Sequence, residues 1–271
     1  MRIALVCNPD SGGGVDVDGL TSELERLGAT VDDERPERLV VAGGDGSIAA
    51  AAARAGALGV PLAVIPAGTA NDFARAIELP RDRAEAARLA AAGTYTRPLE
   101  LAHMGDRPFV NVASTGLAPA AARRAEPLKR PLGPLAYSVG GVLAGLLERP
   151  LECRVEVDGD EVFAGRAWQL TVAASGAFGG GSEIGHADPR DGQLDVVVLP
   201  DGSRLGLVRR AIAMRRGNLG DQPGVVTARG DDVVVEVAPG TRFNVDGEVV
   251  PVTDGRARFR ARAAAFDLVV A

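Results

Sequence analysis

One aspartate lies inside a glycine-rich turn early in the chain. The turn reads Gly43-Gly44-Asp45-Gly46-Ser47, and an alanine-rich helical pattern over Ile48–Ala57 follows at once. Glycines let the backbone approach a ligand or take positive φ, and a helix that begins here directs free N–H groups and its positive dipole end at the same point. An acidic side chain in such a phosphate-binding turn suits a bound cation or a proton transfer, so the pattern indicates nucleotide chemistry.

Two more turns follow short apolar runs that are typical of strands. The first strand, Arg2–Cys7, leads into Asn8-Pro9-Asp10-Ser11-Gly12, and Val60–Ile65 leads into Pro66-Ala67-Gly68-Thr69-Ala70-Asn71-Asp72. Thr69 and Asn71 could hydrogen-bond a ligand or cap the next helix. Taken singly, the first turn is equally typical of a flexible loop, and Asn71-Asp72 of a helix N-terminus. Because parallel strands bring their carboxyl ends to one edge, we expect all three turns to lie together.

The strands and helices that must position these turns change in character along the chain. Strands alternate with helices up to Gly93, which predicts a parallel sheet covered on both faces. Hairpin signals then appear at Gly105-Asp106 and Asp158-Gly159, and short β-prone runs follow, which predicts antiparallel sheet. Helical patterns interrupt this region at 135–147 and 205–215. We place a boundary near Pro98, giving an α/β domain over 1–98 and a β-rich domain over 99–271, whose last strand could return to the first domain.

Bulk composition excludes several classes of protein. The chain has 271 residues and a net charge of -6, which argues against a nucleic-acid partner. Cys7, Cys153, His103 and His186 are isolated from one another in the sequence, so they do not form a metal-ligand spacing or a hydrolase triad. Neither a signal peptide nor an apolar run long enough to span a bilayer is visible, so we expect a cytoplasmic protein.

The ordered motifs carry a family resemblance. N-P-x-S-G, G-G-D-G-[ST] and P-x-G-T-x-N-D-x-A-R resemble the catalytic domain of the diacylglycerol kinase and sphingosine kinase superfamily, especially its soluble bacterial lipid kinases. In the second half, Gly179-Gly180-Gly181, the segment 187–195 and Asn244–Glu248 are similar to the family's glycine run, D-G-x-L-D and D-G-E motifs. NAD kinases and phosphofructokinases share only G-G-D-G. The resemblance implies an N-terminal α/β domain with a parallel sheet and a C-terminal domain like an antiparallel β-sandwich.

The resemblance also implies roles for individual residues. Asp246 matches the general base that takes the proton from the lipid hydroxyl, with Glu248 beside it. Asp191, with the backbone carbonyls of Asp188 and Gln193, matches a structural magnesium site, whereas Asp45 and Asp72 would organise the catalytic Mg²⁺ through water. Spacing alone does not choose between Asp45 and Asp246 as the base. The residues expected to hold the ATP phosphates are Asn8, Pro9, Ser11, Gly12, Gly43, Gly44, Asp45, Gly46, Ser47, Gly68, Thr69 and Asn71.

The function implied is an ATP- and Mg²⁺-dependent kinase that phosphorylates the hydroxyl of diacylglycerol or a related lipid. A kinase like the NAD kinases remains an alternative. So does a catalytically impaired nucleotide- or lipid-binding homologue, because only about ten residues stand between Gly28 and Arg38, where the family usually has another strand and helix.

Basic residues beside apolar helical patterns predict docking on anionic lipid at the inner membrane face. The same pattern is equally typical of core helices with solvated arginines. A homodimer could form. The basic residues concerned are Arg123, Arg124, Lys129 and Arg130 before 132–147, and Arg209, Arg210, Arg215 and Arg216 within 205–216.

Overall fold

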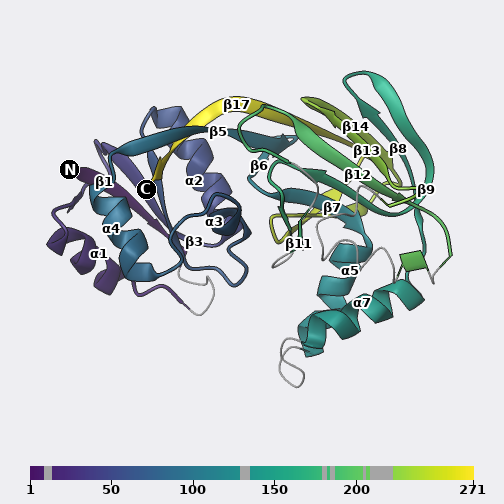
Figure 1. Ribbon diagram of the computed structural model, residues 1–271, viewed down its shortest axis with the longest axis horizontal. Coiled ribbons are helices and arrows are strands. Elements are labelled where there is room, and N and C mark those ends of the chain that lie inside the picture. Colours follow the sequence, from purple (N-terminus) through teal and green to yellow (C-terminus); the bar gives the residue numbers. More distant parts are fainter. Residues whose placement is uncertain (9–13, 129–134, 179–181, 184–186, 204–205, 208–221) are drawn as a thin grey trace.

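The computed structural model covers residues 1–271 and describes all of them except 9–13, 129–134, 179–181, 184–186, 204–205 and 208–221 (Figure 1). Three of the predicted phosphate-binding residues, Pro9, Ser11 and Gly12, therefore lie outside the described residues. So do the run Gly179–Gly181, Lys129-Arg130 and most of the helical pattern over 205–216. None of the described helices is long and apolar enough to cross a bilayer.

The N-terminal part is a parallel sheet with helices on both faces, as the sequence predicts (Figure 1). Its strands lie in the order β2 (Thr30–Val31), β1 (Arg2–Cys7), β3 (Arg38–Gly43) and β4 (Leu62–Pro66). Its helices are α1 (Val17–Arg26), α2 (Asp45–Leu58), α3 (Asp72–Ala76) and α4 (Arg83–Ala92). This alternation places the turns after β1, β3 and β4 at one edge of the sheet.

Successive side chains of β3 point to opposite faces of the sheet, and a different pair of helices covers each face. Leu39 and Val41 pack in one core with α2 and α3, while Val40 and Ala42 pack in another with α1 and α4. All four side chains are fully buried. Successive side chains of a strand point to opposite faces, so a continuous apolar run is what a sheet covered on both sides requires.

Two long strands join this part to the β-rich part. The C-terminal strand β17 (Arg256–Val270) pairs in parallel with β4 at Leu268 and antiparallel with β14 (Asp232–Val237) at its other end. Strand β5 (Tyr95–Met104) runs antiparallel to β17 along most of this length. Pro98 lies inside β5, opposite Asp267, so the chain crosses between the two parts within a strand (Figure 1).

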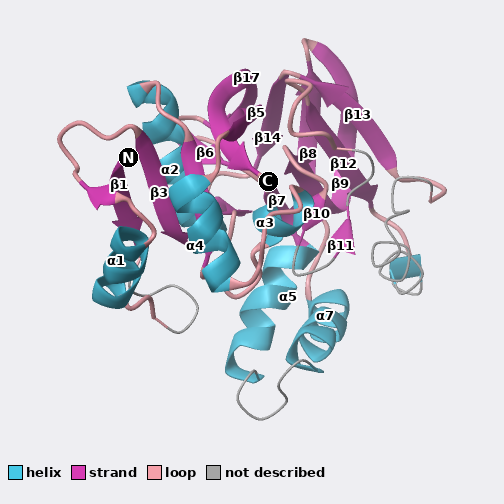
Figure 2. Cartoon of the chain, turned by 60° about the vertical axis from the view of Figure 1, so that its left-hand side comes forward, coloured by secondary structure: helices cyan, strands magenta, loops and turns pink. Residues whose placement is uncertain are grey.

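The β-rich part is mainly antiparallel and packs around a core that contains Phe109, Phe243 and Phe259. After the hairpin partner β6 (Arg107–Phe109), its strands are β7 (Val112–Gly116), β8 (Leu151–Val157), β9 (Asp160–Ala173), β10 (Ala177–Phe178), β11 (Ser182–Glu183), β12 (Leu194–Pro200), β13 (Val226–Gly230), β14, β15 (Thr241–Val245) and β16 (Glu248–Val252). Beside this part lie α5 (Leu117–Ala125), the short 3-10 helix η1 (Glu126–Leu128) and α7 (Leu135–Leu147); α5 and α7 lie side by side (Figure 2).

Several boundaries differ from the sequence prediction. The runs 257–262 and 266–270 form one strand, because the irregularity between Arg262 and Phe266 bends β17 without ending it. The short segment after Gly28 keeps a strand, but β2 is only two residues long. Helix α2 begins at Asp45 instead of after Ser47, which places the Asp45 carboxylate in the first helical turn. The elements that the sequence did not predict are β2, α5, η1, β10, β11, β13 and β16.

Candidate active site

Contacts between the turns after β1, β3 and β4 bring the predicted phosphate-binding residues together. The Asn8 side chain donates to Ser47 Oγ at 3.3 Å and so joins the first turn to the second. The Ala67 N–H donates to the Gly43 carbonyl at 3.0 Å and joins the second to the third. Thr69 is exposed on the third turn. The edge of the sheet therefore carries the described part of the predicted site.

Glycine is needed at Gly44 and Gly68 for close approach. None of Gly43, Gly44, Gly46 and Gly68 has a positive φ, so the expected use of positive φ in the Gly43–Gly46 turn is wrong. A methyl group at Gly68 would instead lie 2.6 Å from the Gly44 Cα. The two backbones touch, and the surface they form is open backbone of the kind that phosphates bind.

Asp45 joins the second turn to the third through helix α3. Its carboxylate accepts hydrogen bonds from the backbone N–H groups of Asp72 at 3.2 Å and Phe73 at 3.0 Å. Burial raises the pKa of Asp45, although these bonds, the Asn111 side chain and Arg75 oppose the rise. Asp45 thus supplies the N-terminal cap of α3.

Asn71 stands at the N-cap position of α3 but does not cap it with its side chain. Its φ is 49°, and its amide instead closes a ring with Gly68, accepting from the Gly68 N–H at 2.8 Å and donating to the Gly68 carbonyl at 2.9 Å. The capping role considered for Asn71 is therefore wrong. The reason is that Asp45 already satisfies the first N–H groups of the helix, which leaves Asn71 to shape the turn.

Asp246 lies in the two-residue turn between β15 and β16, where both it and Gly247 have positive φ. Its carboxylate accepts from three successive backbone N–H groups, those of Val110 at 2.7 Å, Asn111 at 3.1 Å and Val112 at 3.0 Å. Burial raises the pKa of Asp246 to about 7; the N–H groups oppose the rise, and the nearby charge of Asp45 adds to it. A carboxylate with this pKa is suited to accept a proton at neutral pH.

The C-terminal hairpin lies against the second turn, so both halves of the chain build one site. A methyl group at Gly46 would lie 3.2 Å from Glu248 Oε1 and 3.6 Å from the Asp246 carbonyl oxygen. Glu248 is exposed and forms an ion pair with Arg107. Asp72 is buried and forms an ion pair with Arg75, so its charge is already balanced.

Asn111 is a site residue that the sequence reasoning missed. Its backbone N–H donates to Asp246, while its side chain lowers the pKa of Asp45 through a hydrogen bond. The same side chain accepts from the buried Ser175 hydroxyl at 2.9 Å. A single amide within the apolar run Phe109–Ala113 was the available signal, because a buried amide needs partners.

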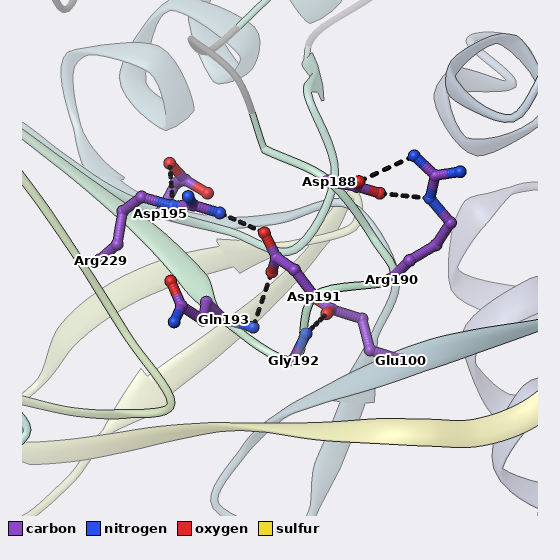
Figure 3. Close-up of polar contacts among 8 residues, drawn as sticks. All are labelled: Glu100, Asp188, Arg190, Asp191, Gly192, Gln193, Asp195 and Arg229. Atoms are coloured by element: carbon purple, nitrogen blue, oxygen red, sulfur yellow. Dashed lines mark hydrogen bonds and ion pairs between the residues drawn. The ribbon is translucent and has the colours of Figure 1, made fainter.

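The second group of predicted metal ligands lies elsewhere, beside the crossing strands (Figure 3). Both carboxylate oxygens of Asp188 accept hydrogen bonds from Arg190, Oδ1 from Nε at 2.6 Å and Oδ2 from Nη2 at 2.8 Å. Asp191 forms an ion pair with Arg229 and also accepts from the Gln193 N–H at 2.9 Å. Arg229 further contacts Asp195 at 3.3 Å. The guanidinium groups of Arg190 and Arg229 thus pair with three carboxylates, those of Asp188, Asp191 and Asp195.

Glu100, on β5, adds a buried carboxyl to this cluster. Its Oε2 accepts from the Gly192 N–H at 2.7 Å, whereas its buried Oε1 has no hydrogen-bond partner among the described residues. Burial raises the pKa of Glu100 to about 8, and the charges of Asp191, Asp188 and Asp195 add to the rise. Burial, together with the neighbouring negative charges, therefore keeps this carboxyl largely protonated near neutral pH.

The two predicted metal positions differ in how well their side chains fit a cation. At the first position, Asp45 offers the carboxylate oxygens that Mg²⁺ prefers, beside the predicted phosphate turns, whereas the carboxylate of Asp72 is paired with Arg75. At the second position, the Asp191 carboxylate is the one predicted side-chain ligand, and Arg229 pairs with it; the backbone carbonyls of Asp188 and Gln193 stay predicted ligands. No group of three or more His, Cys, Asp or Glu side chains in the described part of the chain is arranged to hold a metal.

Known protein families match both parts of this chain. Residues 16–104 match the diacylglycerol kinase catalytic domain, and residues 111–269 match the YegS C-terminal NAD kinase beta sandwich-like domain. The chain belongs to this family of lipid kinases. It is 33% identical over 240 residues to a "Probable lipid kinase YegS-like" of Pseudomonas putida, covering 85% of this chain and 76% of that protein. It is 30% identical to a diacylglycerol kinase of Mycobacterium tuberculosis, covering 91% and 88%. Members of the family are phosphotransferases with an alcohol group as acceptor, and this chain is one.

Solved structures support the fold. A diacylglycerol kinase of Bacillus anthracis superposes with a TM-score of 0.75 at 19% identity, covering 100% of this chain and 97% of that one. An NAD kinase of Archaeoglobus fulgidus in complex with ATP superposes with a TM-score of 0.51 at 16% identity, covering 100% and 94%. The predicted α/β and antiparallel β architecture of a lipid kinase is confirmed.

Arg229 provides a test of the acidic cluster. The substitution Arg229→Ala removes the cation that Asp191 and Asp195 share. We expect a loss of about 1 kcal/mol for this half-exposed pair, and a melting temperature lower by roughly 2–4 °C. Added Mg²⁺ should raise the melting temperature of the variant more than that of the wild type, measured by calorimetry with and without a chelator.

Arg154→Ala is the matched control, because this exposed arginine on β8 pairs with two carboxylates outside the acidic cluster, those of Glu161 on β9 and Glu236 on β14. It should gain no extra stabilisation from Mg²⁺. Equal stabilisation of wild type and Arg229→Ala by Mg²⁺ would show that the guanidinium does not stand in for a metal.

Proposed function

We propose that this protein transfers the γ-phosphoryl group of ATP to the hydroxyl of diacylglycerol or a related lipid. The observation that carries the proposal is the placement of Asp246, a carboxylate with a pKa near 7, against the glycine-rich turn of Asp45. A base is useful only where the acceptor hydroxyl meets the phosphate. Relatives named diacylglycerol kinase and lipid kinase support the lipid as acceptor.

In this proposal the glycine-rich turns bind the phosphates, and the hairpin with Asp246 accepts the proton. The touching backbones at Gly44 and Gly68, with Asn8 and Ser47 beside them, hold the phosphates of ATP. Asp246 Oδ accepts the proton of the attacking hydroxyl, and Glu248 lies on the same hairpin. Bound Mg²⁺ would neutralise charge on the phosphates near Asp45 and Asp72. Phosphoryl transfer depends mainly on positioning and charge neutralisation, so this set of groups is sufficient.

Two other functions fit parts of the structure. A kinase that acts on NAD shares the fold, since the archaeal NAD kinase superposes along the whole chain. A catalytically impaired nucleotide- or lipid-binding homologue is consistent with the shortened segment after Gly28, where only β2 remains. Neither accounts as well for the raised pKa of Asp246 together with the lipid kinase relatives.

Phosphate transfer distinguishes the three functions. ATP labelled in its γ-phosphate is supplied with diacylglycerol in mixed micelles, with other lipid alcohols or with NAD. We expect labelled lipid, and we expect Asp246→Asn to lower kcat by about 10²- to 10⁴-fold, because an amide cannot take the proton. Asp267→Asn, an exposed aspartate on β17, should retain wild-type kcat.

Product on NAD alone would contradict the lipid substrate. Binding of ATP without turnover on any acceptor would favour the impaired homologue. Because Asn accepts hydrogen bonds through one oxygen only, circular dichroism of Asp246→Asn checks that the loop at Val110–Val112 is still folded.

We further propose that α7 places the enzyme on an anionic lipid surface at the cytoplasmic face of the membrane. Val139, Val142 and Leu146 are spaced to share one helix face, and they are exposed by 37%, 62% and 56%. The exposed Arg149 follows the helix, and the exposed Arg123 lies on the adjacent α5. Apolar side chains next to cations suit the boundary between headgroups and acyl chains.

Vesicle sedimentation tests this face. We expect wild type to bind vesicles that contain phosphatidylglycerol more tightly than pure phosphatidylcholine. The double change Val142→Asp and Leu146→Asp should weaken binding at least about tenfold, since two half-exposed apolar side chains no longer enter the lipid. Leu58→Asp, which alters an equally exposed leucine at the end of α2, is the control. Unchanged binding of the double variant would remove α7 from the interface.

A further inference from the structure

A hollow lined by arginines lies at the far end of the strands that carry the active site. Its volume is about 300 Å³, at the small end of the range for ligand pockets. The lining residues are Thr115, Gly116, Pro119, Arg123, Glu148, Arg149, Leu151 and Arg242. Arg242 lies on β15 four residues before Asp246, so the hollow is about 13 Å along the strand from the predicted base. It is therefore separate from the active site.

The charges of the lining favour an anion. Arg123, Arg149 and Arg242 are exposed, and none of them forms an ion pair with any described residue. Glu148 is the one acidic residue of the lining, and its carboxylate is bound at 2.6 Å by Arg124, which lies outside the lining. Three of the lining residues are therefore arginines without an ion-pair partner among the described residues, and the one lining carboxylate is paired with Arg124. Guanidinium groups bind phosphate through paired, charge-assisted hydrogen bonds.

The backbone around the hollow is held in place. Gly116 turns β7 into α5 with a φ of 99°, and a methyl group there would lie 2.3 Å from the Trp168 carbonyl oxygen, so only glycine fits. Thr115 Oγ1 donates to the Arg242 carbonyl at 2.9 Å, which fixes the backbone that carries this arginine. The hollow is therefore a preformed surface.

Helix α5 adds to the positive potential. It begins at Leu117, directly after Gly116, and its first turn contains no acidic residue. The Ala118 N–H is capped by the neutral amide of Gln169, at 2.7 Å from Oε1, so the positive end of the helix dipole is not neutralised by a carboxylate. The dipole and the three arginines thus act on the same hollow.

We propose that this hollow binds a phosphate group, carried either by a soluble phosphate monoester or by a phospholipid headgroup. The proposal does not depend on kinase activity, since it concerns groups at the other end of β7 and β15 from Asp246. Binding here would place an anionic ligand next to α5 and the C-terminal end of α7.

Direct binding tests the proposal on the full chain. In one arm, glycerol 3-phosphate is titrated into the protein by calorimetry; in the other, sedimentation compares phosphatidylcholine vesicles with and without phosphatidic acid. We expect saturable binding in at least one arm and a loss of at least about tenfold in the double variant with Arg149→Gln and Arg242→Gln. Binding in the first arm assigns a soluble monoester, and binding in the second arm alone assigns the lipid headgroup.

Arg88→Gln is the matched control, because it removes an exposed arginine from α4, far from the hollow, and should bind as the wild type does. The single variant Arg149→Gln should show a partial loss, which keeps the test valid if the double variant folds poorly. Binding in neither arm, or equal losses in Arg88→Gln and the double variant, would overturn the proposal.

Discussion

The carboxylate of Asp246 is held by three successive backbone N–H groups, and the candidate site depends on this interaction. Burial makes the charged form costly, whereas the N–H groups of Val110, Asn111 and Val112 make it tolerable, so the pKa stays near neutrality. Asn111 then joins this carboxylate to Asp45, whose own bonds hold the start of α3. Two acids from opposite ends of the chain are thereby positioned together, and the charge of Asp45 raises the pKa of Asp246 further.

The two crossing strands maintain this arrangement. Because β5 and β17 pass through both parts of the molecule, the hairpin with Asp246 is attached to the same continuous sheet as the turn with Asp45. The acidic cluster lies at the bend of β17: Glu100 is on β5 between the positions that pair with Arg262 and Phe266, and a methyl group at Gly192 would lie 3.1 Å from Ala263 Cβ. At this point Arg229, on β13, pairs with Asp191 and Asp195, close to where the chain crosses between its two parts.

The sequence predicts local patterns well and long-range partners poorly. The strand over Arg2–Cys7 and the helix over Leu135–Leu147 have the predicted bounds, because periodicity and flanking turn residues specify both. Asp45 and Asp246 were found from glycine-rich turns and family motifs. Asn111, Arg107 and Arg229 were missed, since each acts through a residue more than 30 positions away, and no local pattern reveals such a contact. The sequence leaves Asn71 open between a ligand contact and a helix cap, and the fold gives the cap to Asp45.

Asp246 titrates near neutrality because burial raises its pKa and the charge of Asp45 adds to the rise. A carbon-13 NMR titration of the aspartate carboxyl groups, with Asp246 assigned from Asp246→Asn, measures this directly. The account predicts a pKa of about 7 for Asp246 in the wild type and a lower pKa in Asp45→Asn, where the neighbouring negative charge is removed. An Asp246 carboxyl that titrates in the ordinary range of exposed aspartates, and does not respond to Asp45→Asn, would contradict it.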